Sequence, residues 1–252
     1  MAEQQGAPPK PRKPRAKPAP APAAPARPLW RRGLRWLGRG LGAVAGFYLL
    51  LILLYSFVNP PTGLYQISES IRLGGIERDW VDWDDIAPVA ARSVVAAEDA
   101  NFCLHWGFDM AAIRAAAADG GRRGASTLTQ QVVKNVFLWQ GRSWIRKAAE
   151  ALMTPVVELV WSKQRILEVY LNMAEFGEGV FGIEAAARHD FGIPAAKLTA
   201  QQAARLAAVL PDPKGRDAAK PGPYVRKRAG QIISGADTIL ADGRAACFQG
   251  GN

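Results

Sequence analysis

The chain has 252 residues, of which 49% are hydrophobic and 21% are charged, a balance that is ordinary for a globular protein. Its formal net charge of +10 is unusual, but residues 1–40 hold ten of the basic residues and only one acidic residue. The rest of the chain is therefore close to neutral. A nucleic-acid-binding domain carries its positive charge on the folded surface, so this distribution argues against nucleic acid as a partner.

Residues 1–35 are rich in Pro and Ala as well as in Lys and Arg. Such a composition cannot bury enough apolar surface to offset the conformational entropy that ordering would cost. The sequence therefore predicts a disordered basic tail over residues 1–35.

An uncharged apolar stretch follows over residues 41–58. As a helix it would rise about 27 Å, close to the thickness of a bilayer's hydrocarbon core. A buried core helix would carry more polar positions, and a cleaved signal peptide would have a shorter apolar region and a small-residue cleavage site. We therefore expect one transmembrane helix over residues 37–58, ended by Pro60 and Pro61.

The charges beside this stretch are asymmetric. Arg31, Arg32, Arg35 and Arg39 precede it, whereas no Lys or Arg follows it until Arg72. The positive-inside rule then places the N-terminus in the cytoplasm. The remainder of the chain is expected on the periplasmic side of the inner membrane, and the basic tail is expected to contact anionic lipid.

Residues 64–235 are expected to form a mostly helical domain, followed by a C-terminal extension over residues 236–252. Helix boundaries are legible in this part of the sequence, because Thr127 and Gln130 form one capping-box pattern and Thr199 and Gln202 another. Ser162 is a third N-cap. One expected helix starts around residues 86–88, just after Asp84 and Asp85, and runs to Glu98. The other expected helices include residues 128–137, 163–173 and 200–210.

The chain has two cysteines, Cys103 and Cys247. A periplasmic domain would allow them to form a disulfide that ties the C-terminal end to the middle of the chain. Two unpaired thiols fit the sequence equally well, and spacing alone does not decide between them.

Four segments carry groups suited to chemistry. In the first, Glu98, Phe102 and His105 would share one face if the segment were helical. A carboxylate beside an aromatic ring is partly desolvated, which raises its basicity and suits a general base. A glutamate at a helix end beside a packed histidine is the alternative.

The second segment, residues 124–135, gathers hydroxyl and amide groups at a helix N-terminus and has Lys134 one turn further on. Helix N-termini and lysines attract phosphate, although a well-capped surface helix would look similar. The glycine- and arginine-rich residues 119–125 just before it have the composition of a loop. Such a loop suits either a mobile segment near an anionic ligand or an ordinary solvated surface.

In the third segment, Glu150 lies four residues after Arg146 and three after Lys147, as surface salt bridges do. In the fourth, residues 163–182, we expect Glu168, Asn172 and Glu175 to line one face. The apolar residues of that segment are predicted to be core, and they are Ile166, Leu167, Tyr170 and Leu171.

Taken together, the segments read ED-x-x-F-x-x-H, G-x-ST-x-TQQ-x-x-KN, RK-x-x-E and K-x-x-ILE-x-YLN-x-x-x-x-G. In this order and spacing they resemble the peptidoglycan glycosyltransferase family, in particular its monofunctional, membrane-anchored members. The resemblance covers about residues 55–235 and becomes less clear after about Arg228. It implies an all-α, lysozyme-like, two-lobed glycosyltransferase domain preceded by the single transmembrane helix.

The resemblance also implies an activity, the joining of lipid II units by inverting transfer. A β-1,4 link forms between N-acetylmuramic acid and N-acetylglucosamine, and undecaprenyl diphosphate leaves. Glu98 is implied as the base that deprotonates the acceptor hydroxyl, and Glu150 as a second catalytic carboxylate near the donor. The residues implied to bind substrate are Asp99, Phe102, His105, Gly124, Ser126, Thr127, Gln130, Gln131, Lys134, Asn135, Arg146 and Lys147.

No metal site and no tightly bound cofactor are expected, while Mg²⁺ or Mn²⁺ accompanying the donor diphosphate is left open. The expected partners are lipid II, the growing lipid-linked strand and membrane lipid, with cell-division or cell-wall synthesis proteins as further candidates. No Ser-x-x-Lys motif occurs and the chain ends with the glycosyltransferase region, so no transpeptidase is expected. Two alternatives remain, a lytic enzyme on the same broad fold and a non-catalytic partner of division proteins.

Overall fold

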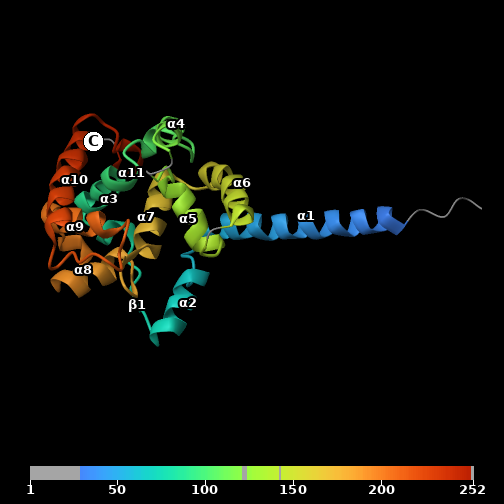
Figure 1. The fold of residues 1–252 in the computed structure, drawn as a ribbon, viewed down its shortest axis with the longest axis horizontal. Coiled ribbons are helices and arrows are strands. Elements are labelled where there is room, and N and C mark those ends of the chain that lie inside the picture. Colours follow the sequence, from blue (N-terminus) through green and yellow to red (C-terminus); the bar gives the residue numbers. More distant parts are fainter. Residues whose placement is uncertain (1–28, 121–123, 142, 251–252) are drawn as a thin grey trace, which may run out of the picture. The chain divides into compact units, whose positions relative to one another are not determined.

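The computed structural model describes residues 29–120, 124–141 and 143–250 (Figure 1). The chain divides into two compact units, residues 1–44 and residues 45–252. The predicted tail over residues 1–28 lies outside the described residues.

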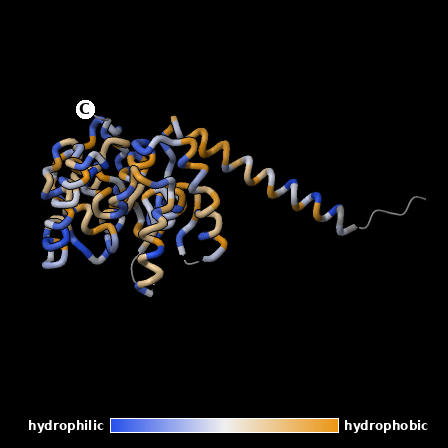
Figure 2. Tube along the Cα trace, turned by 90° about the horizontal axis from the view of Figure 1, so that it is seen from above, coloured by the Kyte–Doolittle hydropathy of each residue, from blue (hydrophilic) through white to orange (hydrophobic). Residues whose placement is uncertain are grey.

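Helix α1 (Leu29–Tyr55) includes residues 37–55 of the predicted membrane span. Among the described residues, Arg32–Tyr55 is the one helix long and apolar enough to cross a membrane, and almost none of it is buried in protein. Figure 2 shows the hydrophobic run along this helix, with hydrophilic residues toward its N-terminal end. The predicted boundaries need correction, because residues 29–35 are helical and the helix ends before residue 58. Hydropathy locates only the uncharged part of a helix. This helix also includes the arginine-containing turns before the apolar run, which contain no proline.

The last turn of α1 is fastened to the domain within residues 45–252. Ile52 is buried, and its carbonyl oxygen accepts a hydrogen bond from Trp161 Nε1 at 2.7 Å. Arg165 Nε donates to the carbonyl oxygen of Tyr55 at 3.1 Å, and the Tyr55 ring stacks on Phe137 with 6.0 Å between centroids. This end of the helix is therefore part of the domain's packing.

The domain is helical, as predicted. The helices are α2 (Leu64–Leu73), α3 (Pro88–Glu98), α4 (Met110–Ala118), α5 (Leu128–Phe137), α6 (Trp144–Val160), α7 (Lys163–Met173), α8 (Ile183–Phe191), α9 (Ala200–Val209), α10 (Pro223–Ala241) and α11 (Ala246–Gln249). Three short 3-10 helices lie between them, η1 (Trp83–Asp85), η2 (Phe102–Leu104) and η3 (Ala195–Lys197).

Two groups of helices give the domain its predicted two-lobed arrangement. Helices α3, α9 and α10 pack against one another, while α5 packs against α6 and α7 (Figure 1). The strands β1 (Glu77–Arg78), β2 (Glu175–Gly177) and β3 (Val180–Phe181) form a small sheet in the order β1-β3-β2. Strand β3 runs parallel to β1 and antiparallel to β2.

The local signals in the sequence place the helix starts correctly. Pro88 occupies the first turn of α3, and both capping boxes, Thr127 with Gln130 and Thr199 with Gln202, are formed. Ser162 accepts a hydrogen bond from the Arg165 backbone at the start of α7. The predicted core residues of α7 are buried, namely Ile166, Leu167, Tyr170 and Leu171. The predicted shared face is wrong for Glu175, because α7 ends at Met173 and Glu175 lies on β2.

The C-terminal residues are not a separate extension. Helix α10 continues across residue 235, and Phe248 of α11 is 1% exposed. The Phe248 ring packs near Phe102, with 6.4 Å between centroids. Cys103 and Cys247 form a disulfide with 5.6 Å between their Cα atoms, which settles the pairing that the sequence left open. Tertiary contacts therefore draw residues 236–250 into the packing of the preceding domain.

We predict that replacing both cysteines, as Cys103→Ser with Cys247→Ser, lowers the free energy of unfolding by about 2–5 kcal/mol. The bridge spans 144 residues, so its loss releases a large loop in the unfolded chain. Denaturant unfolding of the oxidised protein and of the double variant measures this difference. An unchanged midpoint would contradict a stabilising role of the disulfide.

Candidate active site

The first motif does not form one continuous helix. Helix α3 ends at Glu98, Asp99 leaves the helical conformation, and Phe102 lies in η2. The predicted shared face of Glu98, Phe102 and His105 is therefore wrong. The reason is tertiary, because Asp99 turns away to bind a different part of the chain.

Asp99 joins the first motif to the second. It is 7% exposed, and its Oδ2 accepts a hydrogen bond from the backbone N–H of Leu128 at 3.1 Å. Its Oδ1 lies 2.8 Å from His105 Nε2. A carboxylate at a helix N-terminus is favoured by the unpaired N–H groups and the helix dipole. Asp99 thus fixes the start of α5 beside the end of α3.

A second buried network reinforces the same junction. Thr129 Oγ1 donates to Glu158 Oε1 at 2.5 Å, and Lys163 Nζ donates to the same oxygen at 2.8 Å. Lys163 also donates to the carbonyl oxygen of His105 at 2.7 Å and lies 4.4 Å from the centroid of the Phe102 ring. Charged groups this far from water are stable only when paired, and here the pairs connect α5, α6 and α7.

Thr127 caps α5 and also holds the segment after η2. Its Oγ1 donates to the carbonyl oxygen of Gly107 at 2.7 Å. Gly107 has a φ of +79°, and a Cβ there would lie 2.4 Å from Thr154 Cγ2. Only glycine fits this position without strain. Gln130 completes the cap by accepting from the Thr127 backbone N–H at 3.1 Å.

Five of the predicted substrate-binding residues therefore make their polar or packing contacts inside the protein. They are Asp99, Phe102, His105, Thr127 and Gln130. These contacts position the neighbouring motif residues, and direct contact of the five with substrate stays a prediction.

Glu98 has a different environment. Its Oε2 accepts a hydrogen bond from Gln131 Nε2 at 2.9 Å, and Gln131 Oε1 accepts from the Tyr170 hydroxyl at 3.4 Å. Burial raises the pKa of the Glu98 carboxyl above its ordinary value, while the Gln131 hydrogen bond and the charges of Arg228 and Lys134 oppose that rise. A carboxylate with a raised pKa accepts protons more readily, as a general base requires.

The third motif forms a buried ion cluster instead of an ordinary surface pair. The Glu150 side chain is 3% exposed and accepts from Arg146 Nη1 at 2.7 Å. Lys147 Nζ pairs with its other oxygen, and Arg146 Nε donates to the carbonyl oxygen of Gly141 at 2.9 Å. Glu150 therefore holds two cations in fixed directions on α6.

Lys134 lies within electrostatic range of both this cluster and Glu98. Burial lowers the pKa of the Lys134 amine, and the charges of Arg146 and Lys147 lower it further, against the opposing charges of Glu150 and Glu98. In the part of the chain that the structure describes, no carboxylate forms an ion pair with Lys134. Three cations accompany Glu150, so the cluster around it has an excess of two positive charges.

Three predicted site residues are not brought into this cluster. Gly124 and Ser126 are exposed, and they follow residues 121–123 of the predicted glycine- and arginine-rich loop, which lie outside the described residues. Asn135 accepts a hydrogen bond from Gln140 Nε2 at 3.4 Å.

Two residues near Glu98 were missed by the sequence analysis. Arg228 donates to the carbonyl oxygen of Ala97 at 3.0 Å, and its charge lowers the pKa of Glu98. Tyr170 was assigned only to the core, yet its hydroxyl reaches Gln131. A buried tyrosine hydroxyl usually needs a hydrogen-bond partner. The sequence analysis could therefore have expected a polar neighbour for Tyr170. No spacing rule links Arg228 on α10 to Glu98.

Comparison with known proteins now bears on this geometry. The model of a family described as Transglycosylase matches residues 66–237. The chain belongs to this transglycosylase family.

The relatives of the chain are similar over most of their length. A biosynthetic peptidoglycan transglycosylase of Jannaschia sp. (strain CCS1) is 63% identical over 214 residues, 85% of this chain and 90% of that protein. Proteins of the same name from Pseudomonas putida (strain W619) and Xanthomonas campestris pv. campestris (strain B100) are 50% and 48% identical. These matches cover 79% and 80% of this chain, and 89% and 87% of the relatives. They support a peptidoglycan transglycosylase that acts on lipid-linked glycan, on the lysozyme-like fold that the motifs predicted.

We predict that Glu98→Gln stabilises the folded protein at neutral pH. The folded pKa of Glu98 is raised, so ionisation of Glu98 reduces stability as pH rises through that pKa. The variant removes this ionisation but keeps an oxygen that can accept from Gln131. Thermal unfolding across pH 4–8 should show a higher melting temperature for the variant than for the parent at high pH. This difference in melting temperature should disappear at low pH. A difference that stays constant with pH would contradict the raised pKa.

Proposed function

We propose that the chain polymerises glycan strands from lipid II by inverting transfer and releases undecaprenyl diphosphate. A β-1,4 link between N-acetylmuramic acid and N-acetylglucosamine results. One observation carries this proposal. A partly buried carboxylate with a raised pKa lies at the end of α3, and Lys134 lies within electrostatic range of both it and a cation cluster on α6.

On the acceptor side, Glu98 removes the proton from the 4-hydroxyl of N-acetylglucosamine as that oxygen attacks the donor. Gln131 orients the carboxylate through Oε2, which leaves Oε1 for the hydroxyl proton. The raised pKa brings Glu98 closer to the operating pH, and this increases the driving force for proton transfer.

On the donor side, Lys134, Arg146 and Lys147 hold the diphosphate. Their excess of two positive charges matches the two negative charges of a diphosphate esterified at both ends. Fixed cations stabilise the charge that develops on a leaving group. Such a leaving group needs cations more than it needs a proton, so the acid–base carboxylate pair of a glycosidase is not required.

Glu150 serves this donor side by positioning Arg146 and Lys147, its two ion-pair partners. We propose no tightly bound cofactor. Within the described ranges no three His, Cys, Asp or Glu side chains gather as a metal site. Mg²⁺ or Mn²⁺ would therefore take its oxygen ligands mainly from the donor diphosphate.

A membrane anchor suits this proposed reaction, because both the donor and the acceptor are lipid-linked and lie in the membrane. We place α1 across the inner membrane with its arginine-flanked end in the cytoplasm and the domain in the periplasm. Helix α6, which carries the cation cluster, also exposes large apolar side chains that suit lipid contact. They are Trp144, Ile145, Leu152 and Leu159.

We further propose that the enzyme is monofunctional, since no Ser-x-x-Lys motif of a transpeptidase occurs in the sequence. Partnership with other cell-wall synthesis or division proteins is compatible with this role, and the basic N-terminal segment is the candidate contact.

A polymerisation assay with lipid II in detergent or vesicles tests the reaction. We expect the full-length enzyme to lengthen strands and Glu98→Gln to lower the rate about 10²–10⁴-fold, because the base is lost. Glu178→Gln, at an exposed glutamate, is the matched control. A parallel series with a chelator measures any need for a divalent cation.

Two outcomes would contradict the proposal. Shortening of pre-formed strands would indicate a lytic enzyme, and retained polymerisation by Glu98→Gln would remove Glu98 as the base.

For the donor side, we predict that Lys134→Ala and Arg146→Ala each lower kcat/KM for lipid II by at least about tenfold, or about 1.4 kcal/mol. Each variant removes a cation from the diphosphate site. Lys197→Ala, at an exposed lysine of η3, should leave turnover unchanged. Normal turnover of the Lys134 and Arg146 variants at low lipid II would count against the diphosphate role.

A further inference from the structure

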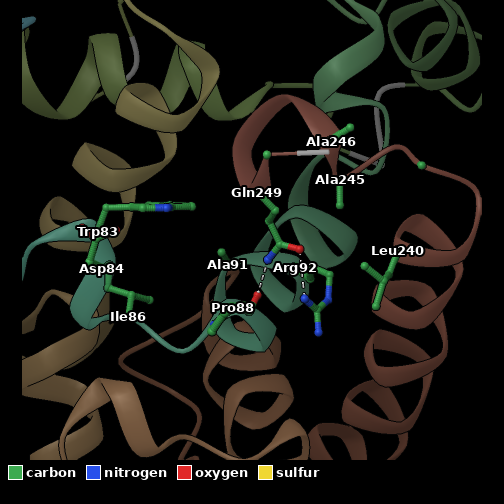
Figure 3. Close-up of a pocket in the computed structure, with 12 residues that line it drawn as sticks. Trp83, Asp84, Ile86, Pro88, Ala91, Arg92, Leu240, Ala245, Ala246 and Gln249 are labelled. Carbon is green, nitrogen blue, oxygen red and sulfur yellow. Dashed lines mark hydrogen bonds between the residues drawn. The ribbon is translucent and has the colours of Figure 1, made fainter. Parts of the chain in front are cut away.

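A cavity of about 580 Å³ lies apart from the site residues discussed above. Its walls come from η1, the first half of α3, the end of α10, and α11. Ligand sites in proteins usually have volumes of about 300–1,000 Å³ and combine apolar walls with a few fixed polar groups. The size of this cavity is in that range, and its polar side chains are Arg92, Gln249 and, on the η1 side, Asp84 (Figure 3).

Arg92 is oriented but not fully used by the protein. Its Nη1 donates to Gln249 Oε1 at 2.9 Å, and Gln249 Nε2 donates to the carbonyl oxygen of Pro88 at 2.8 Å. The Nε of Arg92 is buried and has no hydrogen-bond partner. In the described part of the chain, no carboxylate forms an ion pair with Arg92, although the charge of Asp237 on α10 acts on it. An arginine stays charged in proteins and has five donors, so this one retains capacity for an anion.

The remaining walls are mostly apolar. Figure 3 shows Trp83 and Leu240 on opposite sides of the cavity, with Arg92 and Gln249 between them. Small residues such as Ala91 complete the lining and leave the space between these walls open to a ligand.

The cavity is held in shape by the core beneath it. The Trp83 ring packs edge-on against Phe248, with 6.5 Å between centroids. Phe248 follows Cys247, which the disulfide ties to Cys103. A wall supported in this way needs little reordering when a ligand binds, which favours binding.

These features select a ligand with a carboxylate beside short apolar groups. A carboxylate matches the fork of an arginine side chain and accepts two parallel hydrogen bonds from it. Trp83 and Leu240 offer contact for methyl-sized side chains, whereas a sugar would need several further polar partners. The end of a short peptide made of small residues has this chemistry.

We propose that the cavity binds the terminal carboxylate of the short peptide carried by the glycan substrate. This inference rests on the proposed function, because it takes the substrate to be a peptide-bearing glycan.

The length of a short peptide is compatible with the distance between Glu98 and Arg92. Arg92 and Glu98 are six residues apart on α3, a rise of about 9 Å, and point in directions about 120° apart around the helix. A peptide of five residues spans at most about 17 Å. The separation of Arg92 and Glu98 along α3 is therefore within the span of such a peptide.

Binding can be tested without catalysis, on the full-length protein in detergent, with N-acetyl-D-alanyl-D-alanine as the probe. We expect saturable shifts of the Trp83 indole resonance, identified by comparison with Trp83→Phe. The probe's C-terminal amide should bind about tenfold or more weakly, because it lacks the charge that pairs with Arg92. Equal binding of acid and amide would overturn the proposal.

The L,L stereoisomer of the probe distinguishes the substrate peptide from the C-terminus of a protein as the source of the carboxylate. N-acetyl-L-alanyl-L-alanine represents the C-terminus of a protein partner. We expect the D,D form to bind more tightly, since cell-wall peptides end in D residues. Preference for the L,L form would reject the substrate peptide in favour of a protein partner.

Two variants test the site itself. Arg92→Gln should abolish discrimination between acid and amide, and Leu240→Glu should repel the carboxylate without altering the hydrogen bonds of Arg92. Leu240 is 50% exposed, so the second variant is expected to fold even if the first does not. Gln231→Glu adds the same charge at an exposed position of α10 outside the cavity and should bind like the parent. Unaltered binding by Leu240→Glu would overturn the proposal.

Kinetics link the cavity to the substrate. With lipid II whose peptide ends in a free carboxylate, Leu240→Glu should raise KM about tenfold, but it should leave KM unchanged when that carboxylate is amidated. An equal effect on both substrates would indicate a structural defect and reject the inference. Absence of polymerisation by the unaltered enzyme would instead reject the proposed function, while the dipeptide measurements would still stand.

Discussion

The junction made by Asp99 is the interaction on which the site depends. One carboxylate accepts from the first backbone N–H of α5 and contacts His105, so it joins the end of α3 to the start of α5. Glu98 precedes this junction in the chain, and Gln131 and Lys134 follow it on α5. Because the junction is buried, it resists both water and rotation of the two helices. Glu98, the proposed base, and Lys134, the proposed first cation of the donor site, are thereby held on neighbouring rigid elements.

The second constraint is electrostatic. Lys134 and Glu98 are both partly buried, and burial shifts their pKa values in opposite directions, each toward the neutral form. Each also lies in the field of the other, which opposes the shift. The cluster on α6 adds cations that Glu150 compensates only in part. Such a combination of positive charge and a basic carboxylate suits the dianionic donor and neutral acceptor of the proposed reaction.

Helix α3 serves both ends of the proposed substrate path. Glu98 is at its C-terminal end, and Arg92, nearer its start, lines the cavity between η1, α10 and α11. The disulfide and Phe248 bring α11 against this region, so the C-terminal segment forms part of the cavity wall. Stability and binding are thus coupled through the same few contacts.

The sequence by itself determined the features that depend on near neighbours. Capping boxes and the N-cap at Ser162 are local, and they were placed correctly because a few consecutive residues satisfy the free backbone groups. The apolar span was also recognised from neighbouring residues, although its helix starts earlier and ends sooner than predicted. The family motifs predicted the residues of the ion cluster, but local spacing suggested a surface salt bridge, and only tertiary packing buried Glu150.

Tertiary structure alone decided the break after Glu98, the role of Asp99, and the approach of Arg228 from α10. It also decided the pairing of Cys103 with Cys247 and the cavity around Arg92. In each case the partners are far apart in the chain. Burial and long-range hydrogen bonds then outweigh local propensity, and a pattern of neighbouring residues carries no record of them.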